Sequence, residues 1–128
     1  MEKLYEQQNI EALTKAERGR LIEKLFLVMC KGMGHTVRQN FTPKIDFLVN
    51  DAIYVEVKAY FSLNTIACKF NMTKRQREKA DLLAGWDGRQ HCFYIIPVFL
   101  IPKNGVSITP HIGKPSKWAT YKNAWYLF

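Results

Sequence analysis

The spacing of apolar residues changes once in the first half of the chain, and this change restricts the fold more than any other feature. Across Lys15–Met33 the apolar residues recur every three or four positions, which predicts an amphipathic helix. Thr14 is expected to be its N-cap, with Glu17 three residues on as in a capping box. After the helix the period falls to two, which predicts β-strands. The expected strands are Thr36–Phe41, Ile45–Val49 and Ile53–Tyr60.

The second half of the chain continues with helix and strand patterns. A polar stretch, Phe61–Met72, has no clear period. Thr73–Trp86 is expected to form a second helix, and the apolar run Cys92–Ile101 a buried strand. Val106–Ile112 follows an Asn-Gly turn and is expected to pair as a further strand behind that turn. The order helix, three strands, helix, strand predicts an α/β domain with a mixed sheet flanked by helices.

Length and composition fit one folded domain. The chain has 128 residues, of which 48% are apolar and 13% aromatic, and this composition excludes intrinsic disorder. We expect one domain over residues 1–128, with a lead-in at 1–13, a core at 14–101 and an extension at 102–128. The aromatic residues of the extension could be core, a dimer contact or a platform for bases. Core or dimer contact is favoured, because rings at a chain end must be buried.

The charge of the chain indicates its kind of partner. Nineteen Lys and Arg against eleven Asp and Glu give a net charge of +8, which favours nucleic acid before acidic lipid or acidic protein. Cys30, Cys68 and Cys92 are widely spaced, and they predict buried thiols in a reducing compartment rather than a zinc site. The first residues lack the pattern of a signal peptide, and no run is long enough to span a bilayer. We therefore expect a cytoplasmic protein, in a prokaryotic, archaeal or viral context, with no membrane partner.

The third expected strand contains charged residues among apolar ones. Glu56 and Lys58 are two positions apart and so share one face, opposite an apolar face. A carboxylate and an ammonium in the middle of an apolar strand cost free energy of folding. Their presence there therefore indicates a function. The alternative is that this face is exposed to solvent and that Asp46, on the preceding strand, is only a turn residue.

The register of the hairpin decides whether Asp46 joins Glu56. Directly paired residues of antiparallel strands lie on one face, so the two carboxylates meet only if the position numbers of each pair add up to 102, as 46 and 56 do. This register needs a three-residue loop, Asn50-Asp51-Ala52, with Asn or Asp at a positive φ. A two-residue loop of Asn50-Asp51 would place Asp46 on the other face. The sequence allows both loops.

In the first register, these residues have the chemistry of a metal-dependent phosphodiesterase. Asp46 and Glu56, with the backbone carbonyl of Val57, suit a hard divalent cation, Mg²⁺ or Mn²⁺. Such an ion polarises a phosphate oxygen and acidifies a bound water. Lys58 would position that water or neutralise charge on the pentavalent transition state. The expected product is a cut phosphodiester bond.

The pattern Asp46…Glu56-x-Lys58, after a helix and before a basic helix and an apolar strand, resembles the PD-(D/E)xK nuclease superfamily. The resemblance covers Ala16–Ile101 and implies a restriction-endonuclease-like fold with an αβββαβ core. It places Phe93–Ile101 as the closing core strand.

The resemblance also implies a further glutamate on the first helix. The segment Gly19-Arg-Leu-Ile-Glu23 is similar to the Gly-x-x-x-Glu spacing of archaeal Holliday junction resolvases. Glu23 is at the edge of the apolar stripe of that helix, where it could reach over the sheet. Glu17 is its rival at the other edge, and Glu23 is favoured.

A third part of the resemblance concerns contacts with DNA. Thr73-Lys-Arg-Gln76 is similar to the Ser/Thr-x-x-Gln pattern of small stand-alone nucleases in the superfamily. A helix N-terminus with basic residues could hold a backbone phosphate near the metal, although these side chains could equally be a solvated face. The hypothetical phosphate contacts are Lys69, Lys74, Arg75, Gln76 and Arg77.

Together, these features predict an Mg²⁺-dependent endodeoxyribonuclease with Glu23, Asp46, Glu56 and Lys58 as its catalytic residues. A short chain has little room for a domain that reads sequence, which favours recognition of branched DNA by a Holliday junction resolvase-like homodimer, in recombination or repair. The alternatives are a sequence-specific endonuclease of restriction or homing type, a non-catalytic DNA-binding module of the same fold, and a protein whose basic face meets an acidic partner.

Overall fold

The expected change from helix to strands is present in the structure. A computed structural model describes residues 12–42, 45–61, 67–109 and 116–128, so most of the expected lead-in lies outside the described residues. Helix α2 (Lys15–Gly32) begins with a capping box, in which the Glu17 amide donates to Thr14 Oγ1 over 3.1 Å and the Thr14 amide donates to Glu17 Oε1 over 2.9 Å. The strands that follow are β1 (Val37–Thr42), β2 (Ile45–Val49) and β3 (Ile53–Tyr60).

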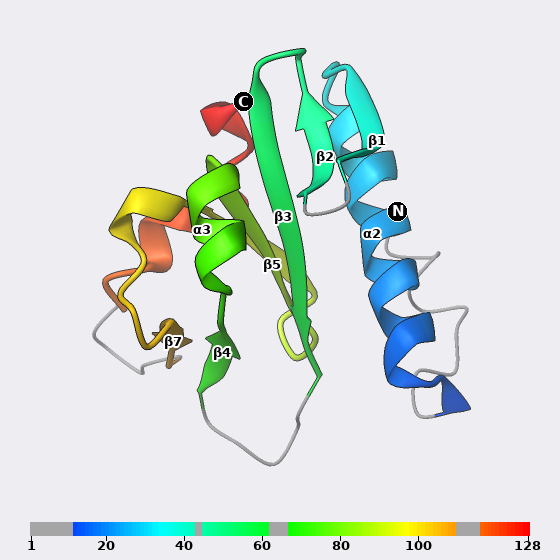
Figure 1. Ribbon diagram of the computed structural model, residues 1–128. Coiled ribbons are helices and arrows are strands. Elements are labelled where there is room, and N and C mark those ends of the chain that lie inside the picture. The colour runs from blue at the N-terminus through cyan, green and yellow to red at the C-terminus, as the bar shows by residue number, and fades with distance from the viewer. Residues whose placement is uncertain (1–11, 43–44, 62–66, 110–115) are drawn as a thin grey trace.

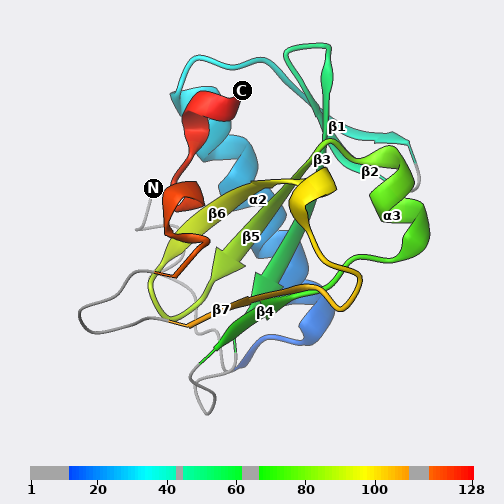
Figure 2. The ribbon, with the colours of Figure 1, turned by 90° about the vertical axis from the view of Figure 1, so that its left-hand side faces the viewer.

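Five strands form one mixed sheet in the order β1-β2-β3-β5-β6, with β5 at Leu82–Asp87 and β6 at Cys92–Pro97. β3 and β5 are parallel, and the other neighbours are antiparallel. The crossover from β3 to β5 contains β4 (Cys68–Phe70) and helix α3 (Lys74–Lys79), and β4 pairs with β7 (Val106–Ile108) in a separate two-stranded sheet. Helix α2 lies against one face of the large sheet, and β4 and β7 lie on the other (Figures 1 and 2). The predicted α/β class, a mixed sheet flanked by helices, is confirmed.

The second helix is shorter than the sequence predicts. We expected a helix over Thr73–Trp86, but it ends at Lys79, and Leu82–Asp87 forms strand β5. All six residues of β5 are buried, because this strand has neighbours on both edges and hydrophobic clusters on both faces. A strand of this kind is apolar on both faces and shows no period of two, so its sequence cannot be told from a buried helical segment by periodicity. The second half of the predicted helix was therefore wrong.

Two strand predictions need correction in the same region. Cys92–Ile101 ends as a strand at Pro97 and continues as the 3₁₀ turn η2 (Val98–Leu100). The strand that follows α3 in the predicted αβββαβ order is β5, which pairs with β3, and β6 follows it at the edge of the sheet. Val106–Ile112 forms a strand only as far as residue 108 within its described part, and its partner is β4, inside the stretch that showed no period.

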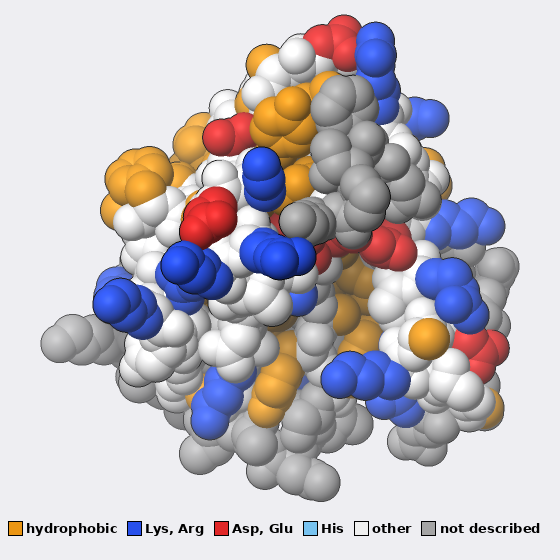
Figure 3. Space-filling model, viewed as in Figure 1, with side chains coloured by type: hydrophobic (Ala, Val, Ile, Leu, Met, Phe, Trp, Pro, Cys, Tyr) orange, Lys and Arg blue, Asp and Glu red, His pale blue; other side chains and the backbone are white. Residues whose placement is uncertain are grey.

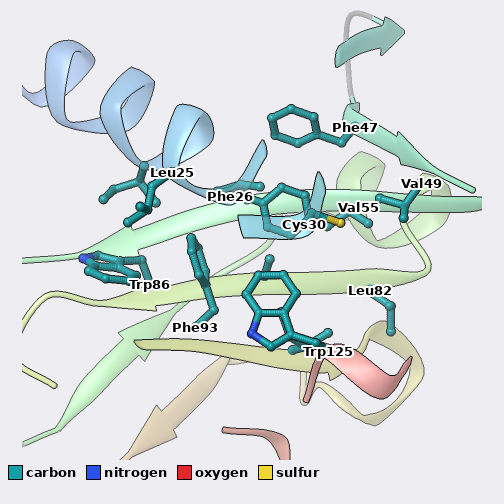
Figure 4. Packing of buried hydrophobic residues seen from close by; sticks show 14 of the residues in the cluster. Leu25, Phe26, Cys30, Phe47, Val49, Val55, Leu82, Trp86, Phe93 and Trp125 are labelled. Atoms are coloured by element: carbon teal, nitrogen blue, oxygen red, sulfur yellow. The ribbon is translucent and has the colours of Figure 1, made fainter. Parts of the chain in front are cut away.

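Two hydrophobic clusters cover the two faces of the sheet. The first lies under α2 and centres on Phe26, whose ring centroid is 5.1 Å from that of Phe47 and 5.8 Å from those of Phe93 and Trp125 (Figure 4). The second cluster includes Trp118. Trp118 and Trp125 are both buried in the chain itself, so of the two expected roles of the C-terminal aromatics, core or dimer contact, these two residues have the first. The 3₁₀ turns near them are η3 (Ala119–Tyr121) and η4 (Trp125–Leu127).

The cysteines are buried, as the sequence predicts. Cys30, Cys68 and Cys92 are all free thiols. Burial raises the pKa of Cys30 and of Cys92 to about 11, so these thiols stay protonated and unreactive near neutral pH. Among the helices of the described residues, none combines the length and the apolar character that a membrane crossing requires.

A close approach at Gly85 of β5 gives a test of this packing. A Cβ on Gly85 would lie 2.7 Å from the ring of Phe70, which is itself buried. We expect Gly85→Ala to lower the free energy of unfolding by about 1–3 kcal/mol, because an overpacked core must move a buried ring. Urea denaturation measures this difference.

Gly19→Ala is the matched control for that variant. A Cβ on Gly19 of α2 meets nothing within 4 Å. Because alanine is the better helix former, this variant should gain about 0.5–1 kcal/mol. Equal stability of the two variants would contradict the packing described for β5.

Candidate active site

The β2–β3 hairpin has the register that brings the carboxylates together. Phe47 lies opposite Val55, and the pairing continues to Val49 opposite Ile53. The loop is therefore residues 50–52, and Asn50 and Asp51 have φ values of 53° and 55°. This is the three-residue loop with positive φ that the sequence allowed.

Side-chain contacts of Asn50 hold the loop. Its Oδ1 accepts a hydrogen bond from the Thr36 amide over 3.1 Å, and its Nδ2 donates to the Phe128 carbonyl over 3.3 Å. One polar side chain thus connects the hairpin turn to the entry of β1 and to the last residue of the chain. The left-handed conformation suits Asn, whose short side chain hydrogen-bonds locally.

Asp46 lies where the backbone pairing of β2 and β3 stops. The paired residues run from Val49–Ile53 to Phe47–Val55 and no further. At the next position of β3 that faces β2, the Val57 amide donates to Asp46 Oδ2 over 2.8 Å. If the pairing of β2 and β3 continued, a backbone carbonyl of β2 would accept this hydrogen bond. Here the Asp46 carboxylate accepts it instead, and the bond fixes Asp46 beside Glu56.

Glu56 and Lys58 occupy the same face of β3, as predicted. The side chain of Glu56 is 7% exposed and that of Lys58 is 30% exposed, and Lys58 Nζ lies 3.9 Å from Glu56 Oε2. The face is therefore not simply solvated. Burial first, and then the charge and hydrogen bond of Asp46, raise the pKa of Glu56 to about 8, against a smaller opposing effect of Lys58.

Glu23 completes a group of three carboxyl groups. It is half-buried on α2, and its pKa is raised to about 7 by burial and by a hydrogen bond and charge repulsion from Asp46, while Arg20 lowers it. Glu17, the other candidate, is exposed and hydrogen-bonds Thr14 in the capping box. The structure therefore brings Glu23, and not Glu17, to Asp46.

The donor set fits a hard divalent cation. Among the described residues, no three Asp, Glu, His or Cys side chains form a ready-made metal site. The predicted set needs only two, Asp46 and Glu56, because the third protein ligand is the Val57 carbonyl and Mg²⁺ keeps several waters. The N–H and C=O of a strand residue point to the same side, so the Val57 carbonyl points to the side of the strand where Asp46 accepts the Val57 amide. Burial is the main cause of the raised pKa of Glu56, and the neighbouring Asp46 adds to it.

The predicted DNA contacts differ in how free their side chains are. Lys69, Lys74 and Arg75 are exposed. Gln76 instead forms a capping box, its Oε1 accepting from the Thr73 amide over 2.9 Å. Arg77 donates to the carbonyls of Ile101 and Pro102. The Ser/Thr-x-x-Gln pattern therefore has a structural explanation here, as the start of a six-residue helix.

Comparison with known proteins bears on the fold. No family model matches the chain, and no curated protein matches it. Among solved structures, that of a bacterial homing endonuclease, I-Ssp6803I, matches with a TM-score of 0.75 over 89% of this chain and 90% of that chain, at 16% sequence identity. The two chains share a fold. This agrees with the restriction-endonuclease-like class, and at this identity it establishes the fold alone.

Sequence reasoning missed two basic residues beside the site. Lys15 and Arg18 of α2 line a cavity of about 660 Å³ together with Lys58 of β3. Their separation of three positions, which places them on one side of a helix, was the available signal. The sequence alone does not show which side of α2 faces the unpaired part of β3, so it does not connect these two residues with Lys58.

The carboxyl cluster predicts an unusual pH dependence of stability. The pKa of Glu56 rises from 4.5 to about 8 on folding, so the folded chain binds this proton more tightly than the unfolded chain does. Metal-free protein should therefore lose stability as the pH rises from about 4.5 to about 8. Thermal denaturation in EDTA across this range measures the effect.

Glu56→Gln should reduce this dependence, since the amide does not titrate, and should leave the part that comes from Glu23, whose pKa is raised to about 7. Glu78→Gln, at an exposed glutamate on α3, is the matched control and should leave it unchanged. Stability that rises with pH over the range in the wild-type protein would contradict the arrangement of the three carboxyl groups.

Proposed function

We propose that this chain is a divalent-metal-dependent DNA endonuclease that hydrolyses phosphodiester bonds. The observation that supports this most is the meeting of Asp46, Glu56 and Lys58 at the point where the pairing of β2 with β3 stops, with Glu23 in hydrogen-bond contact with Asp46. Burial and the neighbouring Asp46 raise the proton affinity of Glu23 and Glu56, so the ionised cluster is costly for folding. A cation bound between the carboxyl groups would offset that cost.

Each residue has a distinct role in the proposal. Asp46, Glu56 and the Val57 carbonyl hold Mg²⁺ or Mn²⁺, which when bound polarises a phosphate oxygen and acidifies water. Lys58, next to Glu56 and partly exposed, neutralises charge that develops on the phosphate or orients the attacking water. Glu23 supports the site through its hydrogen bond with Asp46.

We infer that the substrate is linear duplex DNA cut at a discrete site, as by a restriction or homing endonuclease. The shared fold with a bacterial homing endonuclease over nearly the whole length of both chains supports this substrate class. Cutting of both strands with one site per chain would call for a homodimer.

A second candidate is a Holliday junction resolvase. It is favoured by the Gly19-to-Glu23 spacing on α2 together with the contact of Glu23 and Asp46. Both candidates use the same catalytic residues and differ in the DNA that they bind.

Cleavage assays test the function and separate the two substrates. Long linear duplex DNA, a labelled four-way junction and a single strand are incubated with the protein in Mg²⁺ or in EDTA. We expect Mg²⁺-dependent cutting of the linear duplex into discrete fragments, and a fall in rate of about a hundredfold or more in Lys58→Ala. Lys31→Ala, at an exposed lysine in the last turn of α2, should cut like the wild type.

Other outcomes revise the proposal in defined ways. Cutting of the junction alone would keep the catalytic residues and assign the resolvase substrate. Binding of DNA without cutting in Mg²⁺ or Mn²⁺ would overturn the enzyme and leave a DNA-binding module. Cutting that persists in Lys58→Ala and in Asp46→Asn would show that the active site lies elsewhere.

A further inference from the structure

A groove beside the proposed active site is lined by basic side chains and by strand backbone. Its volume is about 660 Å³, and it lies between the first turns of α2 and the second half of β3. The described residues that line it are Lys15, Arg18, Gly19, Val57, Lys58, Ala59, Tyr60 and Phe61. Figure 3 shows a hollow on this face of the molecule, with apolar side chains inside it and Lys and Arg side chains on both sides.

The groove exists because β2 is shorter than β3. β2 pairs with β3 only as far as Val55, so the rest of β3 faces α2 across the groove instead of a neighbouring strand. The carbonyls of Tyr54 and Tyr60 accept from the amides of Asp81 and Gly88, which shows that the backbone groups of the even positions face β5. The odd positions face the other way, so the Ala59 amide points toward the groove.

The side chains across the groove are cationic. Arg18 is half-buried, with its guanidinium 5.5 Å from the centroid of the Phe61 ring, and Lys15 is exposed one turn earlier on the same side of α2. Lys58 contributes a third positive charge where the groove meets the carboxylates. None of the described residues that line the groove is acidic. The part of the groove away from the carboxyl cluster therefore favours an anionic ligand.

Gly19 keeps the wall of the groove open. It lies inside an 18-residue helix, where glycine is a poorer helix former than alanine, and an added Cβ would meet nothing within 4 Å. No close contact in the protein thus requires glycine at this position. Gly19 lies one turn before Glu23. Because it has no side chain, it leaves space for a DNA strand in the groove to pass along α2.

We propose that this groove binds the DNA backbone phosphate next to the one that is cut, through Arg18, Lys15 and the Ala59 amide. The inference rests on the proposed function and adds to it the path by which the DNA strand leaves the metal site. That path follows the free edge of β3 along α2, and it differs from the contacts expected at Lys69 and α3. Arginine and a backbone amide are both common phosphate donors in protein–DNA interfaces.

A charge series at Gly19 tests the groove without removing any native contact. Gly19→Lys, Gly19→Gln and Gly19→Glu all replace glycine by better helix formers, so each variant should unfold at a higher temperature than the wild type. Binding to a labelled mixed-sequence duplex is measured in EDTA at low salt. We expect affinity in the order Lys, Gln, Glu, with Gly19→Glu on the order of tenfold weaker than Gly19→Gln.

Lys24→Glu is the matched control. Lys24 is exposed on α2 nine positions after Lys15, half a turn around the helix from the groove. Lys24→Glu changes the net charge by twice as much as Gly19→Glu does. It should nevertheless weaken DNA binding less, because Lys24 faces away from the groove. Arg18→Ala should also weaken binding and lower the slope of log K against log salt by about 1.

The outcomes separate this inference from the proposed function. A Gly19 series that changes affinity no more than Lys24→Glu does would overturn the groove, whether or not the wild-type protein cuts DNA. The expected order with no cutting in any metal would support the groove and overturn the nuclease. Absence of DNA binding by the wild-type protein would overturn both.

Discussion

The hydrogen bond from the Val57 amide to Asp46 Oδ2 is the contact on which the rest of the site depends. It closes the β2–β3 hairpin with a side chain instead of a backbone carbonyl, at a distance of 2.8 Å. This contact places a carboxylate next to Glu56 and ends the pairing of β2, and the end of β2 in turn leaves the edge of β3 open toward α2. The carboxyl cluster and the basic groove are thus two consequences of one interruption in the sheet.

The cluster is held together by the surrounding fold against its own repulsion. Burial and the neighbouring Asp46 raise the pKa values of Glu23 and Glu56 to about 7 and about 8, in spite of the opposing effects of Arg20 and Lys58. Two observations account for its persistence. α2 packs on the sheet through Phe26 and its aromatic neighbours, and the Asn50 contacts fix the turn of the hairpin. Stability is therefore given up locally at a site that a cation would neutralise.

The local parts of this arrangement could be predicted from the sequence, and the non-local parts could not. The capping box at Thr14, the alternation along Ile53–Tyr60 and the two possible hairpin loops follow from near neighbours in the chain. The sequence could not choose the loop, because the Asn50 contacts with Thr36 and Phe128 join distant segments. β5 was mistaken for helix since a strand buried on both faces has no period of two. β4 was missed because its partner β7 lies far along the chain.

The proposed function requires Asp46 and Glu56 to hold one cation together in the register that the hairpin adopts. Calorimetric titration of the DNA-free protein with Mn²⁺, in wild type and in Asp46→Asn, tests it most directly. The asparagine can still accept the Val57 amide but lacks the charge. We predict that the wild type binds Mn²⁺ and that Asp46→Asn does not, while the metal-free variant is at least as stable to heat because one repulsive charge is gone. Equal Mn²⁺ binding by the two proteins would show that Asp46 is not a metal ligand.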